Sequence, residues 1–340
     1  MDFILDVLRG IVFWSVVAWN AWILVICYLW LSLSICWFCF KEGLSCLLAT
    51  VDLLGDVILH EQGLRSDPAG RKLLETLFEH QTEALSSWAT VTRLASIVSG
   101  RPLQGYPVAE TSSVWSLKAV RKQTIDRVLG GVLQAGISQI FLFCPGFSGR
   151  SLSDSLRSSK VFEIDDKRVQ EAKRDIVGRS GKEAANLTFI PLETGPEKWG
   201  PGTQAFPRGP PRGFEKDAKS VVVSDGFTLR LSEEEGLLWL KSVAATVAPG
   251  SFVTFEFLTE KGTGGDLWFK LLQLLGLVQW KFSLKLKGTG KECREQLDRL
   301  LKEKAPGLET TEVVWLAEDG AAKQNPGVGI AICRVKKTGK

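Results

Sequence analysis

From residue 138 onward, short apolar runs alternate with segments that have the polar composition and spacing of helices. The first five runs are QIFLFC, KVFEID, NLTFIPL, KSVVVSDGF and SFVTFEFL. This alternation is typical of an α/β protein with a parallel, doubly wound sheet. The last two runs, TEVVWLAED and VGIAICRV, are separated only by a loop, so we expect them to pair antiparallel at one edge of the sheet.

The turn after QIFLFC is the first place to expect a ligand, because parallel sheets bind ligands at the carboxyl ends of their strands. Gly146 and Gly149 in this turn would let a ligand approach the backbone, and the N-terminus of the following helix favours negative charge. About 20 residues further on, Glu163 and Asp165 end the second strand, where a carboxylate can accept hydrogen bonds from ribose hydroxyls. Together these features predict a nucleotide-like ligand.

The residues at the start of the turn narrow the identity of that ligand. Cys144 and Pro145 stand where a dinucleotide site has its first glycine, which disfavours NAD or FAD. No GxxxxGK[ST] motif follows the first strand, so a P-loop is absent. A ligand with a ribose and no phosphate does not require this turn to accommodate a pyrophosphate, and S-adenosylmethionine is such a ligand.

Residues 11–40 carry no charged side chain, and their only strongly polar residue is Asn20. Because about 20 apolar residues suffice to span a bilayer, this run predicts an N-terminal transmembrane helix. A hairpin that turns near Asn20 and a buried core helix are the alternatives. Basic residues are more frequent after the run than before it, which places the C-terminal side in the cytosol. Sugar on the sequon Asn186-Leu187-Thr188 would instead place it in the lumen.

Charge and composition exclude several classes of function. The formal net charge of +4 is spread over 42 basic and 38 acidic residues, which argues against a nucleic-acid-binding protein. With seven Cys and only two His, the chain offers no cluster with the spacing of a zinc site and little support for a His-based catalytic triad. We therefore expect neither a nucleic-acid partner nor a metal.

The chain is expected to have three parts. Residues 1–43 would form the membrane anchor, residues 44–111 a helical linker or cap region, and residues 112–340 the α/β domain. Within the helical region, Asp67 precedes Pro68, a pattern typical of an N-cap followed by the first residue of a helix.

Two blocks of the sequence resemble the leucine carboxyl methyltransferase family and its bacterial relatives. The first block is RKQTIDRVLGGVLQAGISQIFLFCPGFSGRSLSDSLRSSKVFEIDDKRVQEAKRDIV and the second is VVVSDGFTLRLSEEEGLLWLKSVAATVAPGSFVTFEFL. Members of the family have an Arg-bearing helix, a strand that runs into a glycine turn, and a second strand that ends in Glu-x-Asp. The resemblance covers about residues 112–335 and implies a class I S-adenosylmethionine-dependent methyltransferase fold, a Rossmann-like sheet of seven strands with an antiparallel edge strand.

The resemblance also implies roles for particular residues. Arg121 would pair with the cofactor carboxylate, Gly146 would pass beneath its methionine portion, and Glu163 or Asp165 would hold its ribose.

Other family positions differ in this chain. Cys144 replaces the first glycine of the turn, Glu193 replaces an Asp near the adenine, and Asp225 replaces a Glu at the edge of the reaction centre. Together these changes could mark a weakened cofactor site.

These inferences predict a membrane-anchored O-methyltransferase that acts on a carboxylate or hydroxyl of a small or lipidic substrate. A carboxylate acceptor needs no base, whereas a hydroxyl acceptor would need one, and Asp225 is then the candidate. The alternative is a catalytically inactive relative that serves as a membrane-anchored interaction module, and the altered turn at Cys144 is the observation that favours it.

Overall fold

The structure is a computed structural model, and it describes residues 2–78, 82–100, 114–181, 185–192, 211–260, 281–316 and 327–337. The chain divides into two compact units, which are described separately. The first unit comprises residues 1–110, 146–153 and 171–183, and the second comprises residues 111–145, 154–170 and 184–340. The predicted domain boundaries at residues 43 and 111 remain predictions.

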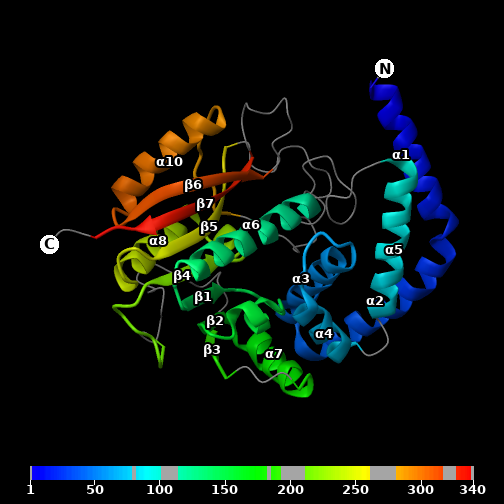
Figure 1. The fold of residues 1–340 in the computed structure, drawn as a ribbon, viewed down its shortest axis with the longest axis horizontal. Coiled ribbons are helices and arrows are strands. Elements are labelled where there is room, and N and C mark those ends of the chain that lie inside the picture. The colour runs from blue at the N-terminus through cyan, green and yellow to red at the C-terminus, as the bar shows by residue number, and fades with distance from the viewer. Residues whose placement is uncertain are drawn as a thin grey trace. The chain divides into compact units, whose positions relative to one another are not determined.

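The second unit is built on a seven-stranded sheet with the order β3-β2-β1-β4-β5-β7-β6 (Figure 1). The strands are β1 (Gln139–Phe143), β2 (Lys160–Asp166), β3 (Leu187–Leu192), β4 (Ser220–Ser224), β5 (Phe252–Leu258), β6 (Leu308–Leu316) and β7 (Val328–Val335). Strands β1 to β5 pair in parallel, and β7 is antiparallel to both β5 and β6. The predicted doubly wound sheet with an antiparallel pair at one edge is therefore confirmed.

Helices bury both faces of this sheet. The helices are α6 (Val114–Gln134), α8 (Glu233–Thr246) and α10 (Gly290–Lys304). Helix α7 (Lys167–Arg179) follows β2, and its residues are shared between the units. Alternate residues of β1 pack to opposite sides, so that Phe141 and Phe143 join the core with α8 and α10, whereas Ile140 and Leu142 join the core with α6. This alternation follows from the two-residue period of a strand.

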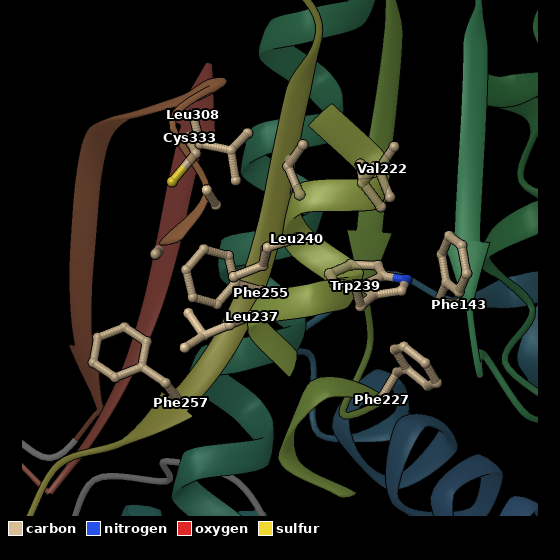
Figure 2. Close-up of a cluster of buried hydrophobic side chains, with 14 of the residues drawn as sticks. Phe143, Val222, Phe227, Leu237, Trp239, Leu240, Phe255, Phe257, Leu308 and Cys333 are labelled. Atoms are coloured by element: carbon tan, nitrogen blue, oxygen red, sulfur yellow. The ribbon is translucent and has the colours of Figure 1, made fainter. Parts of the chain in front are cut away.

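Aromatic side chains pack together in the core under α8 (Figure 2). Trp239 of α8 lies edge-on to Phe143, with ring centroids 5.1 Å apart, and Phe227 lies 5.4 Å from both rings. Phe143 is the last residue of β1 and Phe227 follows β4, so this cluster fixes the ends of two central strands. The capping box of Ser232 and Glu235 sets where α8 begins.

The first unit is helical. Its helices are α1 (Asp2–Trp19), α2 (Ala21–Glu42), α3 (Leu44–Glu61), α4 (Pro68–Leu77) and α5 (Thr82–Ser99). Helix α1 packs against α5 through a small buried cluster of Phe13, Val17 and Ala95. The predicted cap of α4 is confirmed, because Asp67 Oδ1 accepts a hydrogen bond of 2.8 Å from the backbone of Gly70.

The prediction of a single transmembrane helix over residues 11–40 is not supported. The helix is interrupted at Asn20, whose backbone N–H donates to Val17 O at 3.1 Å and whose side-chain Nδ2 donates to Val16 O at 2.9 Å. This break divides the apolar run between α1 and α2. Among the helices in the described part of the chain, none is both long enough and apolar enough to cross a bilayer.

Candidate functional site

Three side chains stand level at the carboxyl ends of the central strands. Phe143, the last residue of β1, pairs with Ile164 of β2 on one side and with Ser224 of β4 on the other. The next residue of each strand is therefore in register, which aligns Cys144, Asp165 and Asp225 in a row. The strand order reverses its direction at β1, and this is the point where open α/β sheets bind their ligands.

The register also separates the two predicted ribose-binding carboxylates. Asp165 stands at the end of β2, where its Oδ1 accepts a hydrogen bond of 2.7 Å from the backbone of Asp166. Glu163 is two residues earlier, level with Leu142 within β1, and is buried. Because ligands bind outside the strand ends, the geometry favours Asp165 over Glu163 for contact with a ribose.

Cys144 occupies the first position of the turn in a strained conformation. Its φ of 51° lies in the left-handed region, which costs a residue other than glycine about 1–2 kcal/mol. Burial raises the pKa of the Cys144 thiol well above its ordinary value, and the charge of Asp165 and a hydrogen bond with this carboxylate raise it further. A raised pKa favours the neutral thiol, which contacts Asp165.

A buried ion-pair cluster lies at the third position of the row. Asp225 pairs with two neighbouring residues of α6: Lys122 Nζ lies 2.9 Å from Oδ2 and Arg121 Nε lies 3.3 Å from Oδ1. The structure therefore brings together the predicted residues Arg121 and Asp225. Lys122, which is fully buried, is a site residue that the sequence analysis missed. The signal was present, because Lys122 lies three residues before Ile125 and seven before Leu129, on the buried face of the helix.

Glu256 is a second residue that the sequence analysis missed. This fully buried glutamate of β5 accepts hydrogen bonds from Ser224 Oγ at 2.7 Å, from the backbone of Gly226 at 2.8 Å and from Thr228 Oγ1 at 3.1 Å. It thereby holds the loop that carries Asp225. An acidic residue in the middle of the apolar run FVTFEFL is the signal that could have identified it.

Glu256 predicts a specific pH dependence of stability. Burial raises the pKa of its carboxyl above the ordinary value of 4.5, although Arg121 and the hydrogen bond from Ser224 oppose this shift. An acid with a raised pKa in the folded state favours folding at low pH, and this contribution is lost as the pH rises from about 4.5 through the folded-state pKa. Glutamine at this position does not titrate. The free energy of unfolding of the native chain and of Glu256→Gln is measured with urea between pH 4 and pH 7. The excess of the native chain over the variant is expected to be largest at pH 4 and to shrink toward pH 7. An excess that grows with pH would contradict the raised pKa.

The two glycines of the turn belong to the first unit and are packed by other parts of that unit. Gly146 has a φ of 57°, and a Cβ at this residue would lie 3.3 Å from the Cβ of Ala49. A Cβ at Gly149 would come within 2.1 Å of the backbone nitrogen of Gly70. The turn is further held by the buried Lys173, whose Nζ donates to Ser148 O at 2.8 Å.

One predicted site residue cannot be placed, because Glu193 lies outside the described residues. Within the described ranges, no group of three or more His, Cys, Asp or Glu side chains is arranged to hold a metal ion.

The residues that can be placed have the chemistry that S-adenosylmethionine requires. Arg121 offers a planar cation for a carboxylate, and Asp165 offers a carboxylate at a strand end for ribose hydroxyls. Both belong to the second unit, on either side of β1. The contact of Cys144 with Asp165 is the feature that fits least well, because the thiol uses part of the hydrogen-bonding capacity of this carboxylate.

Comparison with known proteins supports the same family. A family model described as leucine carboxyl methyltransferase matches residues 61–244, more than half of the chain. The chain is 26% identical over 158 residues to a protein of Mycobacteroides abscessus named "Putative S-adenosyl-L-methionine-dependent methyltransferase", with 46% of this chain and 50% of that protein covered. It is 25% identical over 143 residues to a protein of Mycolicibacterium smegmatis that carries the same name, with 42% and 46% covered. The chain thus spans about half the length of each relative.

Among solved structures, an O-methyltransferase family protein from Burkholderia thailandensis is 12% identical, with a TM-score of 0.41 and with 83% of this chain and 72% of that chain covered. The resemblance found in the sequence is confirmed by the family model, and the chain belongs to the leucine carboxyl methyltransferase family.

Proposed function

We propose that this protein is an S-adenosylmethionine-dependent O-methyltransferase that binds its cofactor at the carboxyl ends of β1, β2 and β4. The observation that carries the proposal is the register that aligns Asp165 and Asp225 on either side of β1, with Arg121 paired to Asp225. Asp165 would accept hydrogen bonds from the ribose hydroxyls. A guanidinium has five N–H donors, so pairing with Asp225 through Nε is compatible with a second carboxylate partner for Arg121.

The surroundings of Asp225 favour a carboxylate as the methyl acceptor. When bound, the cofactor supplies an electrophilic methyl group. A hydroxyl acceptor would have to lose a proton to a base, but Asp225 is held by two cations, which stabilise its anionic form and make it a poor proton acceptor. We therefore assign Asp225 the role of positioning Arg121 and its loop. A carboxylate acceptor is already ionised and needs no base, which agrees with the family description.

The proposal is tested with the purified full chain in two steps. Calorimetric titration with S-adenosylmethionine and S-adenosylhomocysteine should show micromolar binding to one site. Transfer of a tritiated methyl group is then measured on fatty acids and other carboxylates, with the matched alcohols as controls. Labelled methyl esters release methanol in mild base and methyl ethers do not, so base lability distinguishes a carboxylate acceptor from a hydroxyl acceptor. A folded chain that binds neither ligand would instead support the inactive, membrane-bound interaction module.

Replacing Cys144 with glycine is expected to tighten cofactor binding several-fold. The change removes the thiol that contacts Asp165, which leaves this carboxylate available to the ribose hydroxyls. Calorimetric titration of Cys144→Ala beside Cys144→Gly checks this reason: alanine also removes the thiol and should tighten binding to a similar extent, whereas the left-handed strain affects the free and bound chains alike. If neither variant binds more tightly than the native chain, the thiol does not weaken the site.

We also propose that the first unit associates with the cytosolic surface of a membrane. Helix α1 exposes Ile4, Leu8 and Ile11 at helical spacing, and α2 exposes Leu29, Leu33, Trp37 and Phe40. Apolar helix faces of this kind lie in the interface between headgroups and acyl chains.

Two measurements test this membrane proposal. The full chain should float with phosphatidylcholine liposomes, and Leu8→Glu should weaken flotation. In eukaryotic cells, Asn186 should carry no sugar. Glycosylation at Asn186, or no flotation by the folded native chain, would contradict the proposal.

A further inference from the structure

The first unit contains a cavity of about 1110 Å³ that has no part in the proposed methyl transfer. It lies between the C-terminal half of α2, the end of α4 and residues 171–179 of α7. None of the residues that line it belongs to the row at the strand ends. Its volume is ample for a drug-sized ligand, since such sites measure about 300–1,000 Å³.

One wall of the cavity is apolar and open to the surface. Leu33 and Trp37, one turn apart on α2, line the cavity although they are 65% and 73% exposed. Phe38, which also lines the cavity, packs edge-on against Phe78 and Phe147, with ring centroids 5.9 Å and 6.2 Å apart. The exposed pair thus gives an alkyl chain an apolar path from the surface to a fixed aromatic wall.

The rim of the cavity carries both signs of charge. Lys41 is 3.7 Å from Glu42, and Arg179 is 3.0 Å from Asp175. Glu171 adds a third acid, so acidic side chains outnumber basic ones on the rim. A headgroup with one anionic and one cationic part can meet both signs, and a quaternary ammonium is also attracted to aromatic faces such as those of Trp37 and Phe38.

We propose that this cavity binds a single-chain amphiphile with a zwitterionic headgroup of the phosphocholine type. The alkyl chain enters beside Leu33 and Trp37. The phosphate faces Lys41 and Arg179, and the ammonium faces Glu171. The inference does not depend on methyl transfer, because the ligand is bound and no bond is made or broken.

The test is calorimetric titration of the full chain with dodecylphosphocholine and decylphosphocholine, each below the concentration at which it forms micelles. We expect one saturable site and an affinity about 15-fold higher for the longer chain, since each buried methylene raises affinity about fourfold. Binding that does not saturate, or that is independent of chain length, would overturn the proposal.

Leu33→Glu and Leu29→Glu form a matched pair of variants. The two leucines lie one turn apart on α2 and are 65% and 60% exposed, but only Leu33 lines the cavity. Leu33→Glu should weaken dodecylphosphocholine binding at least tenfold and Leu29→Glu should leave it unchanged. Equal effects of the two changes would mean that the detergent coats an apolar surface, which refutes a defined site.

The headgroup assignment is tested separately with Glu171→Gln. This exposed change should weaken dodecylphosphocholine binding several-fold and should not weaken binding of dodecanoate, which carries no cation. Loss of both ligands to the same extent, with the circular dichroism spectrum unchanged, would refute recognition of the ammonium. Trp37→Ala provides a second exposed change in the wall and should weaken both ligands.

Discussion

Asp165→Asn is expected to lower the affinity for S-adenosylhomocysteine by about 100-fold or more. Hydrogen bonds to a charged group contribute about 1.5–3 kcal/mol each, and two ribose hydroxyls would donate to this carboxylate. Asparagine keeps the shape of the side chain and the acceptor for the backbone N–H of Asp166, so the fold should survive. Calorimetric titration of the native and variant chains measures the effect.

The matched control is Glu163→Gln, two residues earlier on the same strand. Glu163 is level with Leu142, inside the sheet, and its backbone carbonyl accepts a hydrogen bond of 2.7 Å from Gln170. We expect this variant to bind S-adenosylhomocysteine within a few-fold of the native chain. If Glu163→Gln loses binding and Asp165→Asn keeps it, the assignment of the ribose contact from the strand register is wrong.

Lys122→Met is expected to lower the free energy of unfolding by about 3 kcal/mol or more. Removing one partner of a buried ion pair leaves a buried charge, which typically costs about 3–5 kcal/mol. Arg121 stays near Asp225 and compensates in part, which places the expected loss at the low end of this range. Methionine keeps an apolar stem like that of the lysine on the inner face of α6. Urea unfolding of the native and variant chains measures the difference.

A double-mutant cycle separates the ion pair from the packing of the lysine. Asp225→Asn removes the charge that Lys122 neutralises, so the double variant should be more stable than the sum of the two single losses implies, by at least about 1 kcal/mol. Strictly additive losses would show that Lys122 contributes through packing alone.

The sheet could be predicted from the sequence because its strands are short, apolar and separated by helices, and because few strand orders satisfy such a pattern. The buried charges could not be predicted in the same way. Lysine and glutamate are nearly always exposed, and the apolar residues around Lys122 and Glu256 are the only signal in the sequence that these two are buried. Their partners come from distant segments, so the ion pair of Lys122 and the hydrogen bonds of Glu256 are not visible in the sequence. Glu163 and Asp165 also look equivalent along the chain, and only the pairing of β2 with β1 separates them.

The expected transmembrane helix over residues 11–40 is not found among the residues that the structure describes, for a related reason. Hydropathy records that a segment avoids charge, but it does not record where the helix breaks or which partner covers its apolar side chains. At the break, Asn20 donates hydrogen bonds to Val16 and Val17, and the inner face of α1 is covered by α5, which is distant in sequence. Both depend on the three-dimensional structure, about which a hydropathy average over a sequence window carries no information.

The fit between Gly149 and Gly70 changes how the glycine turn should be used to recognise related proteins. Glycines in such a turn are usually counted as evidence for nucleotide binding, because they clear space for a ligand. At residue 149 the missing side chain is instead required by the backbone of α4, since a Cβ would lie 2.1 Å from Gly70 N. A relative could therefore lose its cofactor and still be unable to replace this glycine. For separating active from inactive members, Gly149 is uninformative, whereas the proposed cofactor contacts of Asp165 and Arg121 are the positions to compare.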